Sequence, residues 1–158
     1  MKKKIFILTL LACCFAFAEE KQKEFDYQDM HFKCVGTFKT GWRLCYDTKS
    51  VYVDKEKKEV RALMLNLIPQ EEEDKIRKDF EKLYQDVEKE TGQKPAVNID
   101  ALTYDAVVEK SMGCIVKTDC KSDSLDALCQ DSLMYKISLP EGSPYRTLRD
   151  TLCKDVKF

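Results

Sequence analysis

The chain has 158 residues, a length that fits one domain, with 27 basic and 28 acidic side chains and a formal net charge of −1. This mixed, nearly neutral composition argues against a nucleic-acid binder that works through a strong positive field. A single histidine, His31, excludes a three-histidine zinc site and the paired-histidine helix of a zinc protease.

The first eighteen residues have the order of a secretory signal peptide. Three lysines at 2–4 precede an apolar run over 5–17 that is too short to span a bilayer, and Ala16-Phe17-Ala18 is a small-x-small cleavage motif. We therefore predict a signal peptide over residues 1–18, cut after Ala18, and export from a bacterial cell to the periplasm or the cell surface. The alternative is a lipobox that ends at Cys13, which predicts a lipid anchor on that cysteine.

The mature chain is predicted to begin with a mobile lead-in over residues 19–29, because this segment is charged and poor in apolar side chains. A single α+β domain is predicted over residues 30–158. Removal of the three signal lysines leaves 24 basic and 28 acidic residues, a net charge of −4. This mildly acidic balance predicts no nucleic-acid partner, and the lack of a second long apolar run predicts no transmembrane span.

Export decides how the cysteines are interpreted. Six cysteines remain after the signal is removed: Cys34, Cys45, Cys114, Cys120, Cys129 and Cys153. An even number of cysteines in an oxidising compartment predicts a disulfide framework, here of three bridges. No C-x-x-C spacing is present, which argues against a zinc knuckle and against a thioredoxin-like redox centre.

Four segments have the pattern of strands joined by short turns: residues 30–38, 42–46, 51–53 and 60–68. The last segment is apolar on both faces, which is typical of a central strand, and Pro69 ends it. A turn at Lys39-Thr40 places Cys34 opposite Cys45, so these two form the first predicted disulfide. Together the segments predict an antiparallel β-meander.

Helical patterns follow the meander. Residues 71–91 combine an acidic first turn with apolar side chains at helical spacing, and Gly92 suits the residue after the helix. Three further helices are predicted: from Asp100 to about residue 112, from Ser122 or Asp123 to about residue 133, and from Pro144 onward.

Cys129 and Cys153 then lie on neighbouring helices and are predicted to pair, which leaves Cys114 to pair with Cys120. The predicted fold class is α+β: an antiparallel β-meander packed by a long helix, followed by a disulfide-stapled, mostly helical C-terminal part.

The sequence contains few residues or motifs that could form a catalytic or cofactor-binding site. A Ser-His-Asp or Cys–His arrangement has to use His31, which we interpret as a surface or strand-flanking residue. No G-x-S-x-G motif and no glycine-rich phosphate loop is present. Asp119, Asp123 and Asp126 lack the spacing of an EF-hand and are interpreted as capping residues. We therefore predict no catalytic, cofactor or metal site, and a protein that is not an enzyme.

One segment resembles a known family. It begins at Trp42, continues through Tyr46-Asp47-Thr48-Lys49-Ser50-Val51, and ends in a charged turn and an apolar strand. Residues 42–67 are in this respect similar to the repeating hairpin of surface-adhesin protein E-like proteins. The resemblance implies an exported bacterial protein with an antiparallel sheet and a helix that binds host extracellular components. It covers about a sixth of the chain and transfers no functional residue.

Three functions are consistent with this sequence. The first is a non-catalytic binding or interaction module of the bacterial envelope, whose partner is another protein or an envelope component. Trp42 is its candidate contact residue, because it follows a turn glycine. The second is an inhibitor of an extracytoplasmic enzyme such as a lysozyme or a protease, with a disulfide-held loop around residues 39–42 or 117–122. The third, ranked last, is a hydrolase that uses two carboxylates.

Overall fold

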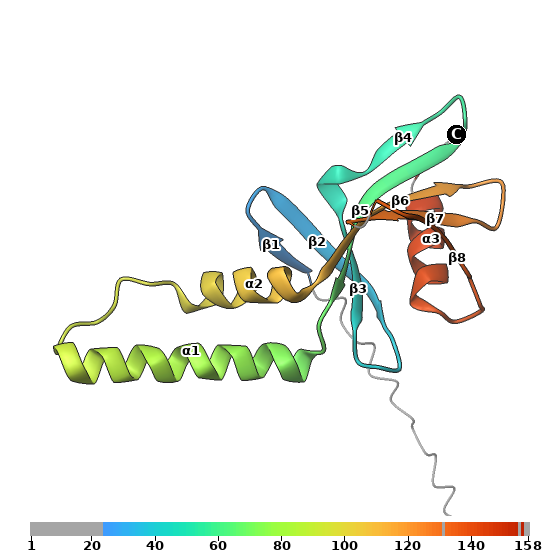
Figure 1. Ribbon diagram of the computed structural model, residues 1–158. Helices are drawn as coiled ribbons and strands as arrows, with labels where there is room; N and C mark the ends of the chain where they lie inside the picture. Colours follow the sequence, from blue (N-terminus) through green and yellow to red (C-terminus); the bar gives the residue numbers. More distant parts are fainter. Residues whose placement is uncertain (1–23, 131, 155, 157–158) are drawn as a thin grey trace, which may run out of the picture.

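The computed structural model describes residues 24–130, 132–154 and 156, which contain eight strands and three α-helices (Figure 1). The strands are β1 (Glu24–Tyr27), β2 (Met30–Thr37), β3 (Arg43–Asp47), β4 (Tyr52–Asp54), β5 (Glu59–Leu67), β6 (Met112–Asp119), β7 (Leu125–Cys129) and β8 (Met134–Ile137). The helices are α1 (Gln70–Thr91), α2 (Ile99–Lys110) and α3 (Pro144–Lys154). The predicted signal peptide, with Cys13 and the Ala18 cleavage site, lies outside the described residues.

The eight described strands form one antiparallel sheet in the order β1-β2-β3-β5-β6-β7-β8, and β4 pairs with β5. β5 is the central strand, as predicted from its sequence. One edge of β5 pairs first with β4 and then with β3, and its other edge pairs with β6 along most of its length. Its side chains are buried on both faces, with Ala62 and Met64 on one and Leu65 and Leu67 on the other.

Different helices cover the two faces of the sheet. α3 packs Leu148 and Leu152 against the face that carries Met64, which we call the α3 face. The opposite face carries Leu65 and contacts α2 through Val107, and we call it the α2 face. Each helix covers part of its face, so the sheet is the common layer on which both hydrophobic clusters are built.

Gly36 lets α3 begin close to the sheet. A Cβ atom added to this glycine of β2 would lie 3.1 Å from Cβ of Pro144, the first residue of α3. The register between β2 and β3 also shifts between Cys34 and Gly36, which marks a β-bulge at the same point. A larger side chain at position 36 would therefore push the start of α3 off the sheet.

The segment 24–27, which we predicted to be part of a mobile lead-in, is the edge strand β1. Phe25 is buried and stacks on Phe32 of β2 and on Tyr104 of α2, with ring centroids 5.2 and 5.6 Å away. The alternation of Glu24 and Asp26 with Phe25 and Tyr27 is a short strand pattern, which the overall charge of the segment masked.

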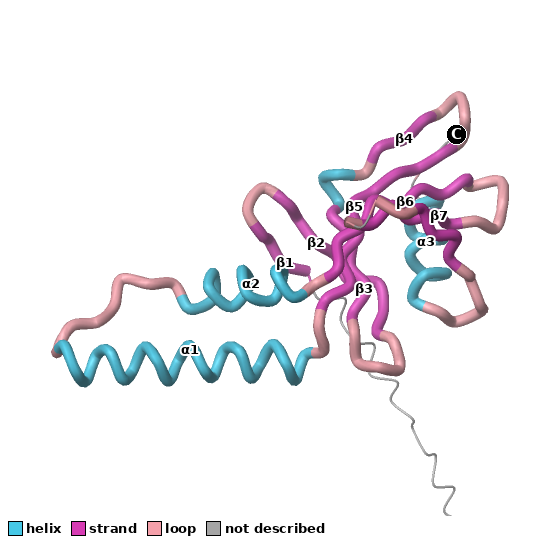
Figure 2. The backbone as a smooth tube through the Cα atoms, in the orientation of Figure 1, coloured by secondary structure: helices cyan, strands magenta, loops and turns pink. Residues whose placement is uncertain are grey.

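The long helix is present, but the prediction that it packs on the meander is wrong. α1 and α2 lie side by side and extend away from the sheet (Figures 1 and 2). We call residues 70–110 the helical arm. At about 1.5 Å per residue, the 22 residues of α1 span about 33 Å, and Glu73 is the one buried residue that α1 contains. No described helix is both long and apolar enough to cross a membrane.

The C-terminal part is not mostly helical, so this part of the predicted fold class is also wrong. Residues 112–137 form two antiparallel hairpins, β6–β7 and β7–β8, where we predicted a helix from Ser122 or Asp123 to about residue 133. Leu125, Leu128 and Cys129 fit a helical spacing, but the buried residues Leu125 and Ala127 show the period of two that a strand requires. The predicted helix from Pro144 is confirmed as α3.

Three disulfides join the six cysteines of the described residues. Cys34–Cys45 is confirmed and links the paired strands β2 and β3. The other two predicted pairs are wrong. Cys114 pairs with Cys129 across β6 and β7, and Cys120 pairs with Cys153 of α3. Placing Cys129 on a strand instead of a helix puts it directly opposite Cys114, and Cys153 is then left for Cys120.

Candidate binding surface

An exposed row of apolar side chains crosses three strands on the α2 face. Ile115 of β6 lies opposite Leu128 of β7, and Leu128 lies opposite Met134 of β8. These side chains are exposed to 52%, 38% and 61% of their maximum. Leu63 of β5, opposite Ile115, extends the row towards the core as a partly buried residue. We call Ile115, Leu128 and Met134 the apolar row.

The apolar row is open because each helix covers another part of the sheet. α2 contacts the α2 face near Leu65 and does not extend over β7 or β8. α3 lies on the opposite face, where Val116 and Ala127 are buried beside the exposed Ile115 and Leu128. In the described residues, no element covers the row, and contiguous exposed apolar side chains of this kind mark interaction sites.

A charged row runs alongside the apolar row on the same face. Arg61, Lys117, Asp126 and Lys136 face one another across β5, β6, β7 and β8. Glu59 lies within ion-pair distance of both cations on β5 and β6, with its oxygens 3.5 Å from Arg61 Nη2 and 3.8 Å from Lys117 Nζ. Exposed pairs of this type contribute at most about 1 kcal/mol, so this row affects orientation and specificity more than stability.

The apolar row ends at β8, an edge strand of the described sheet. Sheet edges expose unpaired backbone N–H and C=O groups, and natural proteins protect them with charge. β1, at the other edge, has Glu24 and Asp26, and both carboxylates lie near His31. β8 instead has Met134, Tyr135 and Ile137, with Lys136 as its one charged residue. β8 is therefore less protected than β1.

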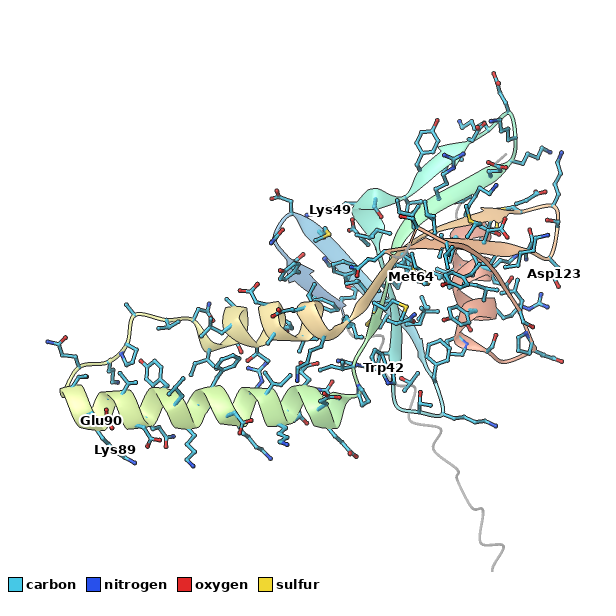
Figure 3. All side chains as sticks on the ribbon, in the orientation of Figure 1. Trp42, Lys49, Met64, Lys89, Glu90 and Asp123 are labelled. Atoms are coloured by element: carbon cyan, nitrogen blue, oxygen red, sulfur yellow. A yellow bond between two sulfur atoms is a disulfide. The ribbon has the colours of Figure 1, made fainter. Side chains whose placement is uncertain are left out.

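The helical arm offers a second, more polar surface. Leu83 and Val87 of α1 are exposed, but charged residues surround them along the helix. Figure 3 shows Lys89 and Glu90 near the far end of the arm. Arg77 of α1 forms an ion pair with Asp100 of α2, and this hydrogen-bonded carboxylate raises the pKa of Arg77. The pair fixes the two helices together without creating a continuous apolar surface.

The candidate contact residue Trp42 and the other residues that were considered for a functional role do not meet at one site. Trp42 is half-buried and packs against the hydrophobic cluster of the α2 face, near the base of the arm (Figure 3). His31 Nδ1 lies 2.8 Å from Asp26 Oδ1, so its described polar neighbours are carboxylates. Asp123 accepts two hydrogen bonds from the Arg146 guanidinium at 2.5 and 2.8 Å. Asp119 Oδ1 accepts one from Lys121 N.

A small pocket between β1 and α2 contains Tyr27 and gives a pH-dependent prediction. Burial and, secondarily, a hydrogen bond to Asp105 raise the pKa of Tyr27 above its ordinary value of 10.0. The folded state therefore favours the protonated phenol, and this contribution to stability is complete below pH 10 and is lost as the pH rises through the raised pKa. We expect wild-type protein to lose more stability between about pH 9 and pH 11 than Tyr27→Phe, measured by urea unfolding.

The control for this prediction is Tyr52→Phe, which removes a phenol from an exposed position of β4. This variant should keep the wild-type dependence on pH. If Tyr27→Phe and wild type lose stability in parallel over the alkaline range, then the Tyr27 phenol does not have the environment described.

Comparison with known proteins gives no relative: no family model, no curated protein and no solved structure matches the chain.

Proposed function

We propose that the protein is an exported, disulfide-stabilised binding protein of the bacterial envelope, without catalytic activity of its own, and that its partner is another polypeptide. The observation that supports this proposal is the open apolar row beside the weakly protected edge strand β8. The three disulfides are typical of a protein that folds in an oxidising compartment, and the signal-like segment over residues 1–18 supports export.

The partner is proposed to contribute an extended segment that pairs with β8. Added strands bind sheet edges through backbone hydrogen bonds, and their alternate side chains provide specificity. Every second side chain of such a segment would point to the α2 face, next to Met134 and in line with Leu128. Apolar residues at those positions would extend the apolar row by one strand, while acidic residues beside them would meet Lys136.

Site-specific photo-crosslinking in the producing bacterium tests this proposal. A photo-reactive amino acid at position 134 should give a discrete adduct with one polypeptide, whereas the same amino acid at Tyr52, which is equally exposed but on β4, should not. Leu128→Asp places a charge within the row and should lower the adduct yield at position 134 at least fivefold, with an unchanged circular dichroism spectrum.

The identity of the adduct decides between the proposal and its rivals. A lipid adduct, or an adduct with the mass of two copies of this chain, would contradict binding of a separate polypeptide. Equal adducts from positions 134 and 52, or a yield that Leu128→Asp leaves unchanged, would show that the apolar row is not the contact surface.

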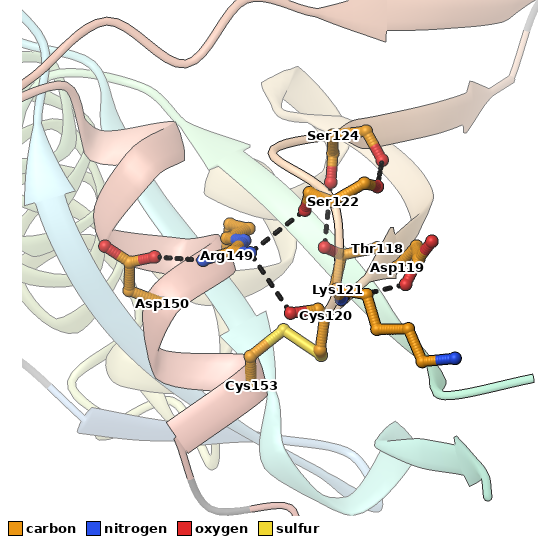
Figure 4. The surroundings of a disulfide bond; sticks show 9 residues. All are labelled: Thr118, Asp119, Cys120, Lys121, Ser122, Ser124, Arg149, Asp150 and Cys153. Atoms are coloured by element: carbon orange, nitrogen blue, oxygen red, sulfur yellow. Dashed lines mark hydrogen bonds and ion pairs between the residues drawn. A yellow bond between two sulfur atoms is a disulfide. The ribbon is translucent and has the colours of Figure 1, made fainter.

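A second candidate function is inhibition of an extracytoplasmic enzyme, and the β6–β7 loop favours it. The Cys120–Cys153 bridge holds this loop to α3, and Arg149 Nη2 donates hydrogen bonds to the carbonyl oxygens of Cys120 and Ser122 (Figure 4). Lys121 is exposed in the loop, so a preorganised basic side chain is presented to solvent. Inhibition assays against lysozyme and a trypsin-like protease, with Lys121→Ala as the matched variant, test this candidate.

A further inference from the structure

A second concave site lies on the α3 face, on the opposite side of the sheet from the apolar row. It is a pocket of about 420 Å³, enclosed by β5, β6, β7, β8 and the start of α3. Its walls include Met64, Met112, Tyr135 and Tyr145, together with the Cys114–Cys129 disulfide. Pockets that bind small molecules have volumes in this range and are lined mainly by apolar and aromatic groups.

One amide side chain is part of the lining of this largely apolar pocket. Asn66 of β5 lies opposite Met112 of β6, and its Oδ1 is buried without a hydrogen-bond partner among the described residues. The sheet does not require this side chain, because the backbone of Asn66 makes the strand pairing to Leu44 and Met112. Burying a hydrogen-bond acceptor away from water without a donor costs free energy. An N–H or O–H group of a bound ligand would therefore stabilise Asn66 Oδ1.

The walls of the pocket favour an aromatic ligand. Two tyrosine rings, two methionine thioethers and a disulfide are polarisable groups, and sulfur atoms make favourable contacts with aromatic rings. Met112 and Tyr135 are about half exposed, so they lie where a ligand would enter from solvent. Among the lining residues, no lysine, arginine, aspartate or glutamate is present, and a charged ligand would therefore lose its hydration without gaining a partner.

We propose that this pocket binds a small, uncharged aromatic molecule with one hydrogen-bond donor, and that the donor is accepted by Asn66 Oδ1. The pocket lies on the other face of the sheet from the apolar row, because paired neighbours in the sheet place Met112 and Tyr135 on one face and Ile115 and Met134 on the other.

Two bicyclic probes of the same shape test the proposal on the oxidised mature protein. Indole has an N–H donor, and benzothiophene has a sulfur atom in its place. Titrations followed by amide NMR shifts should show saturable binding of indole at residues of the pocket, and indole should bind at least fivefold more tightly than benzothiophene. Asn66→Leu keeps the size of the side chain and removes the acceptor, so it should abolish the preference between the two probes.

Ile115→Ser, on the opposite face, is the matched control and should bind both probes like wild type. Nuclear Overhauser contacts between indole and the methyl groups of Met64 and Met112 give a second measurement on wild type that does not depend on the folding of Asn66→Leu. Failure of indole to saturate, equal binding of the two probes by wild type, contacts at other residues, or a preference that Asn66→Leu retains would each overturn the proposal.

Discussion

Glu73→Ala is expected to lower the free energy of unfolding by about 3–5 kcal/mol, because it leaves a buried arginine without its counter-charge. Glu73 of α1 and Arg43 of β3 are 2% and 8% exposed, and their Oε2 and Nη2 atoms are 2.5 Å apart. Arg43 also donates hydrogen bonds to the carbonyl oxygen of Ile68 and to Gln70 Oε1. This group of contacts attaches the base of the helical arm to the sheet.

The matched control is Glu72→Ala, at the neighbouring position of the same helical turn. Glu72 is exposed and lies 3.7 Å from Lys110 Nζ, so its loss should change stability by less than about 1 kcal/mol. The double variant Arg43→Met/Glu73→Leu removes both charges and should recover most of the stability that Glu73→Ala loses. Urea unfolding measures all three variants, and a Glu73→Ala effect no larger than that of Glu72→Ala would contradict a buried, attached arm.

Removal of the Cys120–Cys153 bridge is expected to have an effect of similar size. The bridge closes a loop with a sequence separation of 33 residues, for which the chain-entropy relation gives about 4 kcal/mol. Cys120→Ala/Cys153→Ala should therefore unfold at a much lower urea concentration than wild type. The amides of α3 should also exchange faster with deuterium, because the last turn of the helix is no longer held to the β6–β7 loop.

Ser122→Ala is the control for the bridge, since it changes a side chain of the same loop and leaves the disulfide intact. Ser122 Oγ bonds to Ser124 Oγ at an exposed position, so this variant should stay within about 0.5 kcal/mol of wild type. A bridge variant as stable as Ser122→Ala would show that α3 is held by Leu148 and Leu152 alone.

The elements that sequence analysis predicted correctly have strong local signals. Six of the nine residues of β5 are apolar and Pro69 follows shortly after the strand, and α1 has 22 residues that end before a glycine in the left-handed conformation. Cys34 and Cys45 flank a short turn, and the β-bulge between Cys34 and Gly36 shifts the strands into the register that places the two cysteines opposite each other. Each of these predictions depended on residues close together in the chain.

The errors in the C-terminal part have one physical origin, which is that short apolar runs fit two periods. Leu125, Leu128 and Cys129 match a helix, whereas Leu125 and Ala127 match a strand, and pairing with β6 decides between them. The mistaken helix also changed the predicted disulfides, since it moved Cys129 towards Cys153. β8 was missed for the same reason, although Tyr135 and Ile137 already have the alternation of a strand.

The candidate binding surface, like the strand β7, depends on how the strands pair in the folded protein. The registers of two strand pairs bring three residues into one row: Ile115, Leu128 and Met134. The row stays exposed because α3 lies on the other face of the sheet. Asn66 likewise becomes notable only when its neighbours surround it with apolar groups. The sequence signal for these sites was weak, since it consisted of apolar residues that suit a buried position equally well.

Residues 112–137 form a three-stranded antiparallel unit with one open face, and disulfide mapping is the decisive test of this arrangement. Peptides from the non-reduced protein should show Cys114 bonded to Cys129 and Cys120 bonded to Cys153, because the first bond joins paired positions of β6 and β7. A Cys129–Cys153 bond, or a free thiol at either position, would contradict the strand pairing. The apolar row and the pocket around Asn66 would then both be lost.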